Sequence, residues 1–161
     1  MESITSLIHE LQKDSERCQH ITDLKFRRGT VFGWNFATQT ITYNPNVKNV
    51  QAYLIHEYGH ALLGHHDYSR DIMLIEMERA AWDQAVTISH RYDVPIDFDL
   101  IEASLDTYRD WLHARSTCTN CGSTGVQIEE HRYKCLACHQ QWRVNEARNC
   151  ALRRYPIKKS R

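Results

Sequence analysis

The sequence predicts an α+β fold in which a small antiparallel sheet packs against three or four helices, followed by a smaller cysteine-rich module. Apolar residues recur at helical spacing in several segments, and β-branched and aromatic residues concentrate in residues 24–43. Four of the six cysteines form two CxxC pairs towards the C-terminal end. We place the boundary between the modules at Ser116–Thr117, which gives domains of residues 1–116 and 117–161.

The predicted elements follow one another as a helix, two or three short strands and three further helices. Asn44-Pro45-Asn46 stops the sheet and starts the second helix, because asparagine is a good N-cap and proline suits the first turn. That helix ends near Gly64, since glycine is a common C-terminal stop. The other helices are predicted over about residues 3–18, 71–91 and 97–115.

Formal charge balances over the whole chain, with 20 basic and 20 acidic residues, but the two modules differ. Residues 1–117 contain 11 Lys/Arg and 17 Asp/Glu, a net charge of −6. Residues 118–161 contain 9 Lys/Arg and 3 Asp/Glu, a net charge of +6. This basic cysteine-rich module, with its basic tail LRRYPIKKSR, can therefore attract nucleic acid or an acidic partner.

The chain lacks the sequence features of a membrane or secreted protein. No apolar run approaches the roughly 20 residues that cross a bilayer. The N-terminal residues MESITSLIHELQKDSER have acids where a signal peptide has a basic start and an apolar centre. We expect a soluble, cytoplasmic protein with no membrane partner.

The stretch YLIHEYGHALLGHHD contains an HExxH motif formed by His56, Glu57 and His60. Residues four apart lie on the same face of a helix, so the two imidazoles can bind one metal ion. Zinc suits neutral imidazole ligands and keeps a position open for water. Glu57 lies next to the first ligand, where it would act as general base for a water whose pKa the metal lowers to about 7.

Three residues are candidates for the third zinc ligand: His66, Glu76 and Glu78. His66 has the ten-residue spacing from His56 that three-histidine sites use, but the glycine of such sites falls one residue late, at Gly64. Glu78 shares its helical face with leucine and alanines, whereas Glu76 shares its face with charged residues. Because a buried carboxylate is unfavourable unless it is paired or bound to metal, the periodicity favours Glu78.

HEYGHALLGH followed by ERAAWDQA resembles the motifs of the ImmA/IrrE-type metallopeptidases, which are gluzincin-like enzymes. The resemblance covers about residues 24–90. It implies that His56, His60 and Glu78 bind the catalytic zinc and that Glu57 is the general base. It also implies intracellular cleavage of a protein substrate, often a transcriptional repressor. Trp82 stands where the family commonly has asparagine.

The two CxxC pairs are separated by thirteen residues and consist of Cys118, Cys121, Cys135 and Cys138. Each pair forms a tight knuckle, and two knuckles supply four thiolates for one tetrahedral zinc ion. The residues between them predict a short hairpin, so the pattern is typical of a zinc ribbon. Four thiolates leave no open position, and this zinc is therefore expected to be structural.

The sequence thus predicts a zinc-dependent intracellular peptidase with one catalytic and one structural zinc ion. The alternative is a non-enzymatic regulatory module in which the helical site is structural and the basic ribbon binds nucleic acid or a partner protein. The intact Glu57 favours the peptidase, because a structural site needs no general base.

Overall fold

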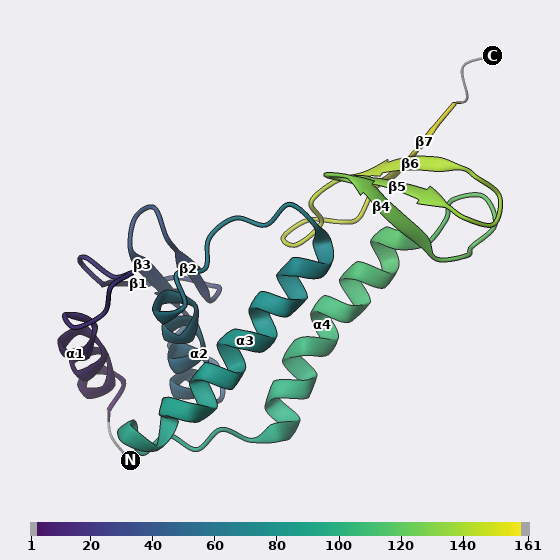
Figure 1. The fold of residues 1–161 in the computed structure, drawn as a ribbon. Helices are drawn as coiled ribbons and strands as arrows, with labels where there is room; N and C mark the ends of the chain where they lie inside the picture. Colours follow the sequence, from purple (N-terminus) through teal and green to yellow (C-terminus); the bar gives the residue numbers. More distant parts are fainter. Residues whose placement is uncertain (1–2, 159–161) are drawn as a thin grey trace. The chain divides into compact units, whose positions relative to one another are not determined.

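The structure, a computed structural model, describes residues 3–158 and confirms the predicted α+β fold (Figure 1). Residues 159–161 of the predicted basic tail lie outside the described residues, as do residues 1–2. The chain divides into two compact units. The first contains the described residues up to Asp67 and Glu76–Glu102, and the second contains Tyr68–Ile75 and the described residues from Ala103 onwards.

The helices lie close to the predicted ranges, apart from the start of the second. They are α1 Ile4–Ser15, α2 Val50–Leu62, α3 Asp71–Ser89 and α4 Phe98–Ser116, with a short 3-10 helix at His90–Tyr92. The predicted cap at Asn44 instead closes a local turn, because its side chain accepts the backbone N–H of Asn46 at 3.0 Å. Asn49, with a left-handed φ of 61°, then leads into α2.

The first unit contains a three-stranded sheet of β1 Lys25–Arg28, β2 Gly33–Asn35 and β3 Thr40–Tyr43, in the order β1-β3-β2. β2 and β3 pair antiparallel, as predicted, whereas β1 and β3 pair in parallel, so the sheet is mixed. The residue after β1, Gly29, donates its N–H to the carbonyl of Tyr43, the last residue of β3, at 2.8 Å. Because β3 pairs with both other strands, it occupies the centre of the sheet.

Helix α2 lies at the centre of the first unit. It packs against α1, β2 and β3 (Figure 1). Every residue from Leu54 to Ala61 is buried, so the helix has no solvent-facing side there. The HExxH motif is consequently held by packing on all sides.

Helices α2 and α3 approach each other at Gly59. A Cβ atom added at Gly59 would lie 2.6 Å from the backbone oxygen of Ala81 and 3.3 Å from its carbonyl carbon. Only a residue without a side chain permits this contact. Glu78 precedes Ala81 by three residues and lies on the same face of α3, so the contact brings its carboxylate towards α2.

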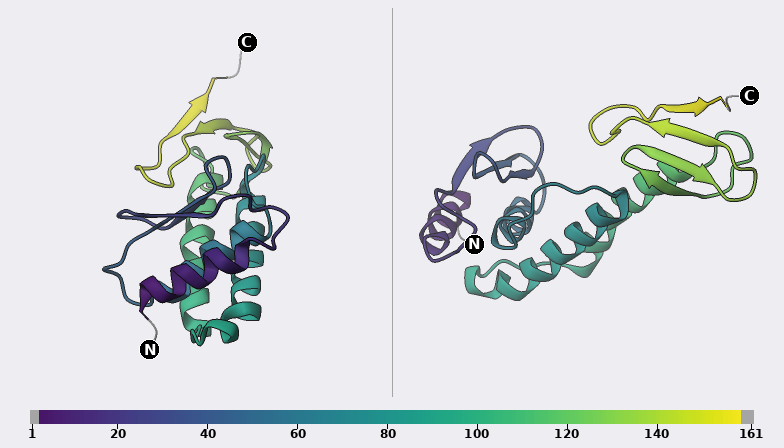
Figure 2. Two further views of the ribbon diagram at one scale, coloured as in Figure 1. Left: turned by 90° about the vertical axis from the view of Figure 1, so that its left-hand side faces the viewer. Right: turned by 45° about the horizontal axis from the view of Figure 1, so that its top comes forward.

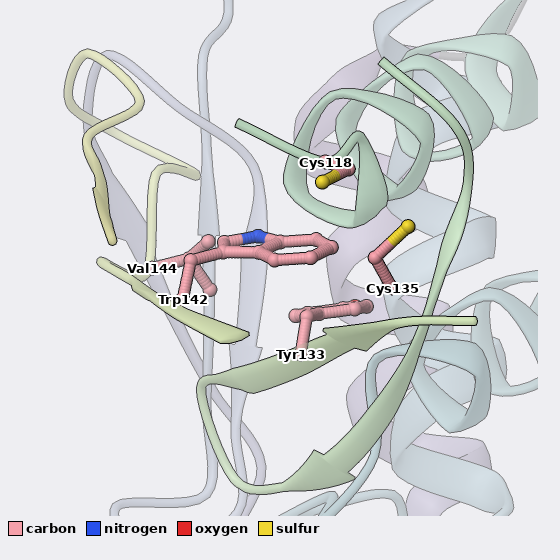
Figure 3. Packing of buried hydrophobic residues seen from close by; sticks show 5 residues of the cluster. All are labelled: Cys118, Tyr133, Cys135, Trp142 and Val144. Atoms are coloured by element: carbon pink, nitrogen blue, oxygen red, sulfur yellow. The ribbon is translucent and has the colours of Figure 1, made fainter. Parts of the chain in front are cut away.

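The second unit contains four antiparallel strands that follow one another as a meander (Figure 2). They are β4 Gly125–Glu129, β5 Arg132–Cys135, β6 Gln141–Val144 and β7 Arg154–Ile157. The predicted hairpin corresponds to β4 and β5. On one face of the sheet the rings of Tyr133 and Trp142 stack with their centroids 5.7 Å apart, beside Cys118, Cys135 and Val144 (Figure 3).

A buried ion pair holds the helix ends of the second unit to its sheet. Arg115 is completely buried at the end of α4, and its guanidinium donates to both carboxylate oxygens of Asp71 at 2.5 and 3.2 Å. The Tyr133 hydroxyl donates to the same carboxylate at 2.5 Å. The Trp142 indole N–H donates to the Arg115 carbonyl at 2.9 Å. This network lies inside the second unit, and the sequence patterns did not predict it.

We expect Gly59→Ala to destabilise the first unit by about 2 kcal/mol, within the usual range for overpacking a core. The added methyl group meets backbone, which cannot change rotamer, so the helices must move apart. This loss exceeds the gain of about 1 kcal/mol from replacing glycine in a helix. Chemical denaturation measures the change.

Gly33→Ala is the matched control, because a Cβ atom at Gly33 meets nothing within 4 Å. Its free energy of unfolding should stay within about 0.5 kcal/mol of the wild type. Equal stability of the two variants would contradict a direct backbone contact between α2 and α3.

Candidate metal centres

The structure brings His56 and His60 of α2 together with Glu78 of α3. The Nε2 atom of His56 lies 3.1 Å from Glu78 Oε2 and 3.2 Å from His60 Nε2. His60 Nε2 lies 3.4 Å from Glu78 Oε1. All three side chains are buried, with 4 to 7% of each residue exposed. Three potential ligand atoms thus point at one another in the interior of the first unit.

This arrangement has the dimensions of a zinc site. Ligands about 2.0–2.1 Å from a tetrahedral zinc ion stand roughly 3.3–3.4 Å apart, which is close to the separations of the three ligand atoms. Two imidazole nitrogens and one carboxylate oxygen are also a donor set that zinc accepts. The three residues can therefore hold a metal ion, and their chemistry is compatible with zinc.

The two other candidate ligands from the sequence lie away from this cluster. Glu76 is exposed on α3, as its periodicity indicates, while Ala81 and Ala85 on the Glu78 face are buried. His66 is exposed in the loop after α2, and its Nδ1 lies 3.0 Å from the Gly64 carbonyl. Neither belongs to the group of ligand atoms around Glu78.

Glu57 is buried beside the cluster, with 7% of the residue exposed. Burial raises the pKa of its carboxyl group, and the nearby Glu78 charge acts in the same direction. The two histidines and a hydrogen bond from the Trp34 backbone oppose this shift without cancelling it. Burial acts in the same sense on Glu78, but its hydrogen bonds to His56 and His60 prevail and lower its pKa. The two carboxylates therefore differ in proton affinity.

His65 contacts the site in a way that the sequence reasoning missed. Its Nδ1 lies 2.8 Å from Nδ1 of His60, on the side of the ring opposite the ligand nitrogen. Burial, together with the charge of His60, lowers the pKa of His65 to about 4, so its ring stays neutral at neutral pH and can accept a hydrogen bond from His60 Nδ1. The Trp34 indole N–H donates to the His65 backbone carbonyl at 3.0 Å and fixes the loop.

The end of α2 explains why His65 returns to His60. Gly64 has a φ of 65°, its N–H donates to the Ala61 carbonyl, and the His65 N–H donates to the His60 carbonyl at 3.0 Å. These bonds form a Schellman motif, in which the residue after the glycine contacts the residue that accepts its N–H. The signal was present in the sequence, because Gly64 as helix stop places His65 over His60.

Trp82 of α3 supports the other ligand. Its ring stacks on the His56 imidazole, with the centroids 4.1 Å apart and the planes inclined by 25°. Trp82 is completely buried and also contacts Tyr53 edge-on. Among residues 3–158, no group hydrogen-bonds to Nδ1 of His56, so stacking rather than a second hydrogen bond orients this ring.

The four cysteines of the second unit also form a group that can hold a metal ion. The sulfur atoms of Cys118 and Cys138 lie 3.6 Å apart, and those of Cys121 and Cys135 lie 3.5 Å apart. Disulfide bonds would bring them to about 2.05 Å, whereas tetrahedral zinc with Zn–S distances of about 2.3 Å sets them roughly 3.8 Å apart. The separations are compatible with four thiolates around one zinc ion.

The two CxxC knuckles share one backbone geometry. In each knuckle, the N–H of the residue after the second cysteine donates to the carbonyl of the first cysteine: Gly122 to Cys118 and His139 to Cys135, both at 3.1 Å. The residue after each second cysteine is left-handed, with φ values of 74° at Gly122 and 60° at His139. His139 is thus a turn residue beside the site, and the cysteine module closes by the same turn twice.

Comparison of the chain with protein families, characterised proteins and solved structures finds no match. Within the described part of the chain, no helix has the length and apolar character needed to cross a membrane. The resemblance to ImmA/IrrE-type peptidases therefore depends on the HExxH and ERAA motifs alone.

We expect His65→Leu to weaken zinc binding at the histidine site about 10- to 100-fold, the usual effect of removing a hydrogen-bond partner from a metal-binding histidine. His65→Asn should largely restore the affinity, because its side-chain oxygen can accept the same hydrogen bond. Chelator competition, followed by mass spectrometry of the intact chain, measures both. His66→Ala serves as control, and an equal loss in that variant would contradict the specific role of His65.

We expect Cys118→Ser to reduce bound zinc from two ions to one per chain, because three thiolates bind zinc more weakly than four. The remaining ion should stay at the histidine site, and Trp142 should become accessible to fluorescence quenchers. Cys150→Ser is the matched control, since this exposed cysteine lies outside the four-cysteine group. Loss of both ions from Cys118→Ser would show instead that the two sites fold as one cooperative body.

Proposed function

We propose that this chain is a zinc-dependent peptidase that hydrolyses a protein substrate. The proposal depends on one observation: two imidazoles and a carboxylate converge with zinc-site spacing, and a second buried carboxylate, that of Glu57, lies next to them in sequence. A purely structural site needs the first three groups but not the fourth. The resemblance to ImmA/IrrE-type peptidases assigns the same four residues.

The residues divide the work between binding and proton transfer. His56, His60 and Glu78 hold the zinc ion, and His65 and Trp82 orient the two imidazoles. Bound zinc supplies Lewis-acid chemistry, polarising a peptide carbonyl and making water more acidic. Glu57 accepts the proton of the attacking water on a carboxylate oxygen and then delivers it to the departing amine.

The substrate class follows from the resemblance alone. A transcriptional repressor in the cytoplasm is the substrate that ImmA/IrrE-type peptidases suggest. The four-cysteine group would hold a second, structural zinc ion. It would stabilise a module too small to bury sufficient apolar surface by itself.

A second candidate function is a non-enzymatic regulatory module in which both zinc ions are structural. The net charge of +6 on residues 118–161 favours it, because such a segment attracts nucleic acid or an acidic protein surface. Under this alternative, the replacement of Glu57 by glutamine changes neither the zinc content nor the binding of nucleic acid or of a partner protein. The two candidates are therefore separated by one substitution.

We expect Glu57→Gln to retain both zinc ions and the fold but to lower peptidase activity about 100- to 10,000-fold, as for the loss of a general base. Glutamine has the same shape, and its side-chain oxygen can accept the Trp34 backbone N–H. The assay incubates wild type and variant with candidate repressors and a proteome-derived peptide library, with and without a chelator. Mass spectrometry identifies the cleaved bonds.

Glu78→Gln provides the metal-free comparison, because a neutral amide is a poor zinc ligand. It should lose the catalytic zinc ion and activity together, while Glu57→Gln loses activity alone. Cleavage by Glu57→Gln at the wild-type rate would eliminate the proposed mechanism. Absence of cleavage by the zinc-loaded wild type across the library would favour the regulatory module.

A further inference from the structure

The four-stranded sheet of the second unit has two faces of different character. The inner face carries Tyr133, Cys135, Trp142 and Val144, all buried (Figure 3). It contacts the helix ends through Asp71 and Arg115. Because successive residues of a strand alternate between faces, the residues between these positions lie on the opposite side. We call this opposite side the outer face.

The strand register arranges the outer face in two rows. One row runs across Arg132, Arg143 and Tyr155, which are paired in sequence from β5 to β7. The second row runs across Val126, Lys134, Gln141 and Ile157. Three cationic side chains, an aromatic ring and two aliphatic side chains therefore share one surface of the sheet.

The cations of this face are only partly neutralised by the protein. Glu129 at the end of β4 forms an ion pair with Arg132 at 2.9 Å, in which the Arg132 side chain is 33% exposed. Arg143, directly opposite Arg132 in the register, is exposed. Like charges at directly opposite positions destabilise a sheet. An anion that contacts both Arg132 and Arg143 relieves that repulsion, so the outer face favours a ligand with several negative charges.

The apolar residues define the kind of polyanion. Tyr155 is 48% exposed at the position opposite Arg143, and Val126 is 43% exposed in the second row. An acidic peptide needs the cations but not an exposed aromatic ring. A single-stranded nucleic acid needs both, because its phosphates bind cations and its unpaired bases stack on aromatic side chains. In a duplex, the base faces are covered by stacking.

We propose that the outer face of β4–β7 binds single-stranded nucleic acid, RNA or DNA. The phosphates lie against Arg143, Lys134 and Arg132, and a base stacks on Tyr155. The proposal depends on the second unit alone and holds whether or not the histidine site is catalytic.

The test uses the full-length, zinc-loaded chain and fluorescence anisotropy with labelled oligonucleotides of about 20 nucleotides, oligo-dT and oligo-U. Tyr155→Ala should weaken binding about 5- to 100-fold, the usual effect of losing one stacked base, while Tyr155→Phe should keep the affinity. Arg143→Ala should weaken binding and reduce the salt dependence of the association constant by about 0.7 in log–log slope, the value for one phosphate contact with a single strand.

Two control variants and one comparison of ligands make the outcome decisive. Lys13→Ala removes an exposed charge from α1 and should leave binding unchanged. Glu57→Gln should also bind normally, so failure of this proposal is distinguishable from failure of the peptidase proposal. Stronger binding to one of the two oligonucleotides tells RNA from DNA as the preferred ligand.

The proposal would be overturned if the wild-type chain bound neither oligo-dT nor oligo-U at low salt. Undiminished binding by both Arg143→Ala and Tyr155→Ala would also overturn it. Binding of polyglutamate or of duplex DNA as tightly as of oligo-dT, with no effect of Tyr155→Ala, would show instead that the face is a general site for anions.

Discussion

The first unit depends on how a buried carboxylate is accommodated. Glu78 is 6% exposed on a helix that packs into the core, and an unpaired charge there would oppose folding strongly. Two imidazoles face it within 3.1 to 3.4 Å, so it is fully engaged by the side chains of α2. The same requirement forces the imidazoles into one orientation, because each must present the same nitrogen. The contacts that compensate the buried charge of Glu78 are thus the same contacts that give the three side chains the geometry of a metal site.

The second unit meets a similar difficulty with a different solution. Its core is small, and its centre contains a completely buried arginine, Arg115, paired with Asp71. A buried ion pair is weak evidence for stability, because desolvation can offset the attraction. Two of the four cysteines, Cys118 and Cys135, belong to this core and pack beside Trp142. A metal ion there would supply stability that the apolar surface cannot.

The sequence predicted well what depends on local spacing. Helical periodicity separated Glu78 from Glu76 correctly as buried and exposed, and the CxxC spacing identified four thiols that converge. It predicted poorly what depends on pairing between distant segments. The parallel pairing of β1 with β3 and the Arg115–Asp71 pair join residues with no shared local pattern. The late start of α2 has another cause: Asn44 bonds to Asn46, so a residue that is good at capping helices closes a turn instead.

The backbone contact at Gly59 has a consequence for how the protein can vary. Most tight contacts in a core can be relieved from either side, because a smaller partner makes room for a larger residue. Here the atoms nearest to Gly59 are the carbonyl oxygen and carbon of Ala81, which every amino acid possesses. No replacement at position 81 creates space, so a change at that position cannot rescue a side chain at position 59. A library randomised at both positions and selected for folding should return glycine at 59, whichever residues the buried position 81 accepts.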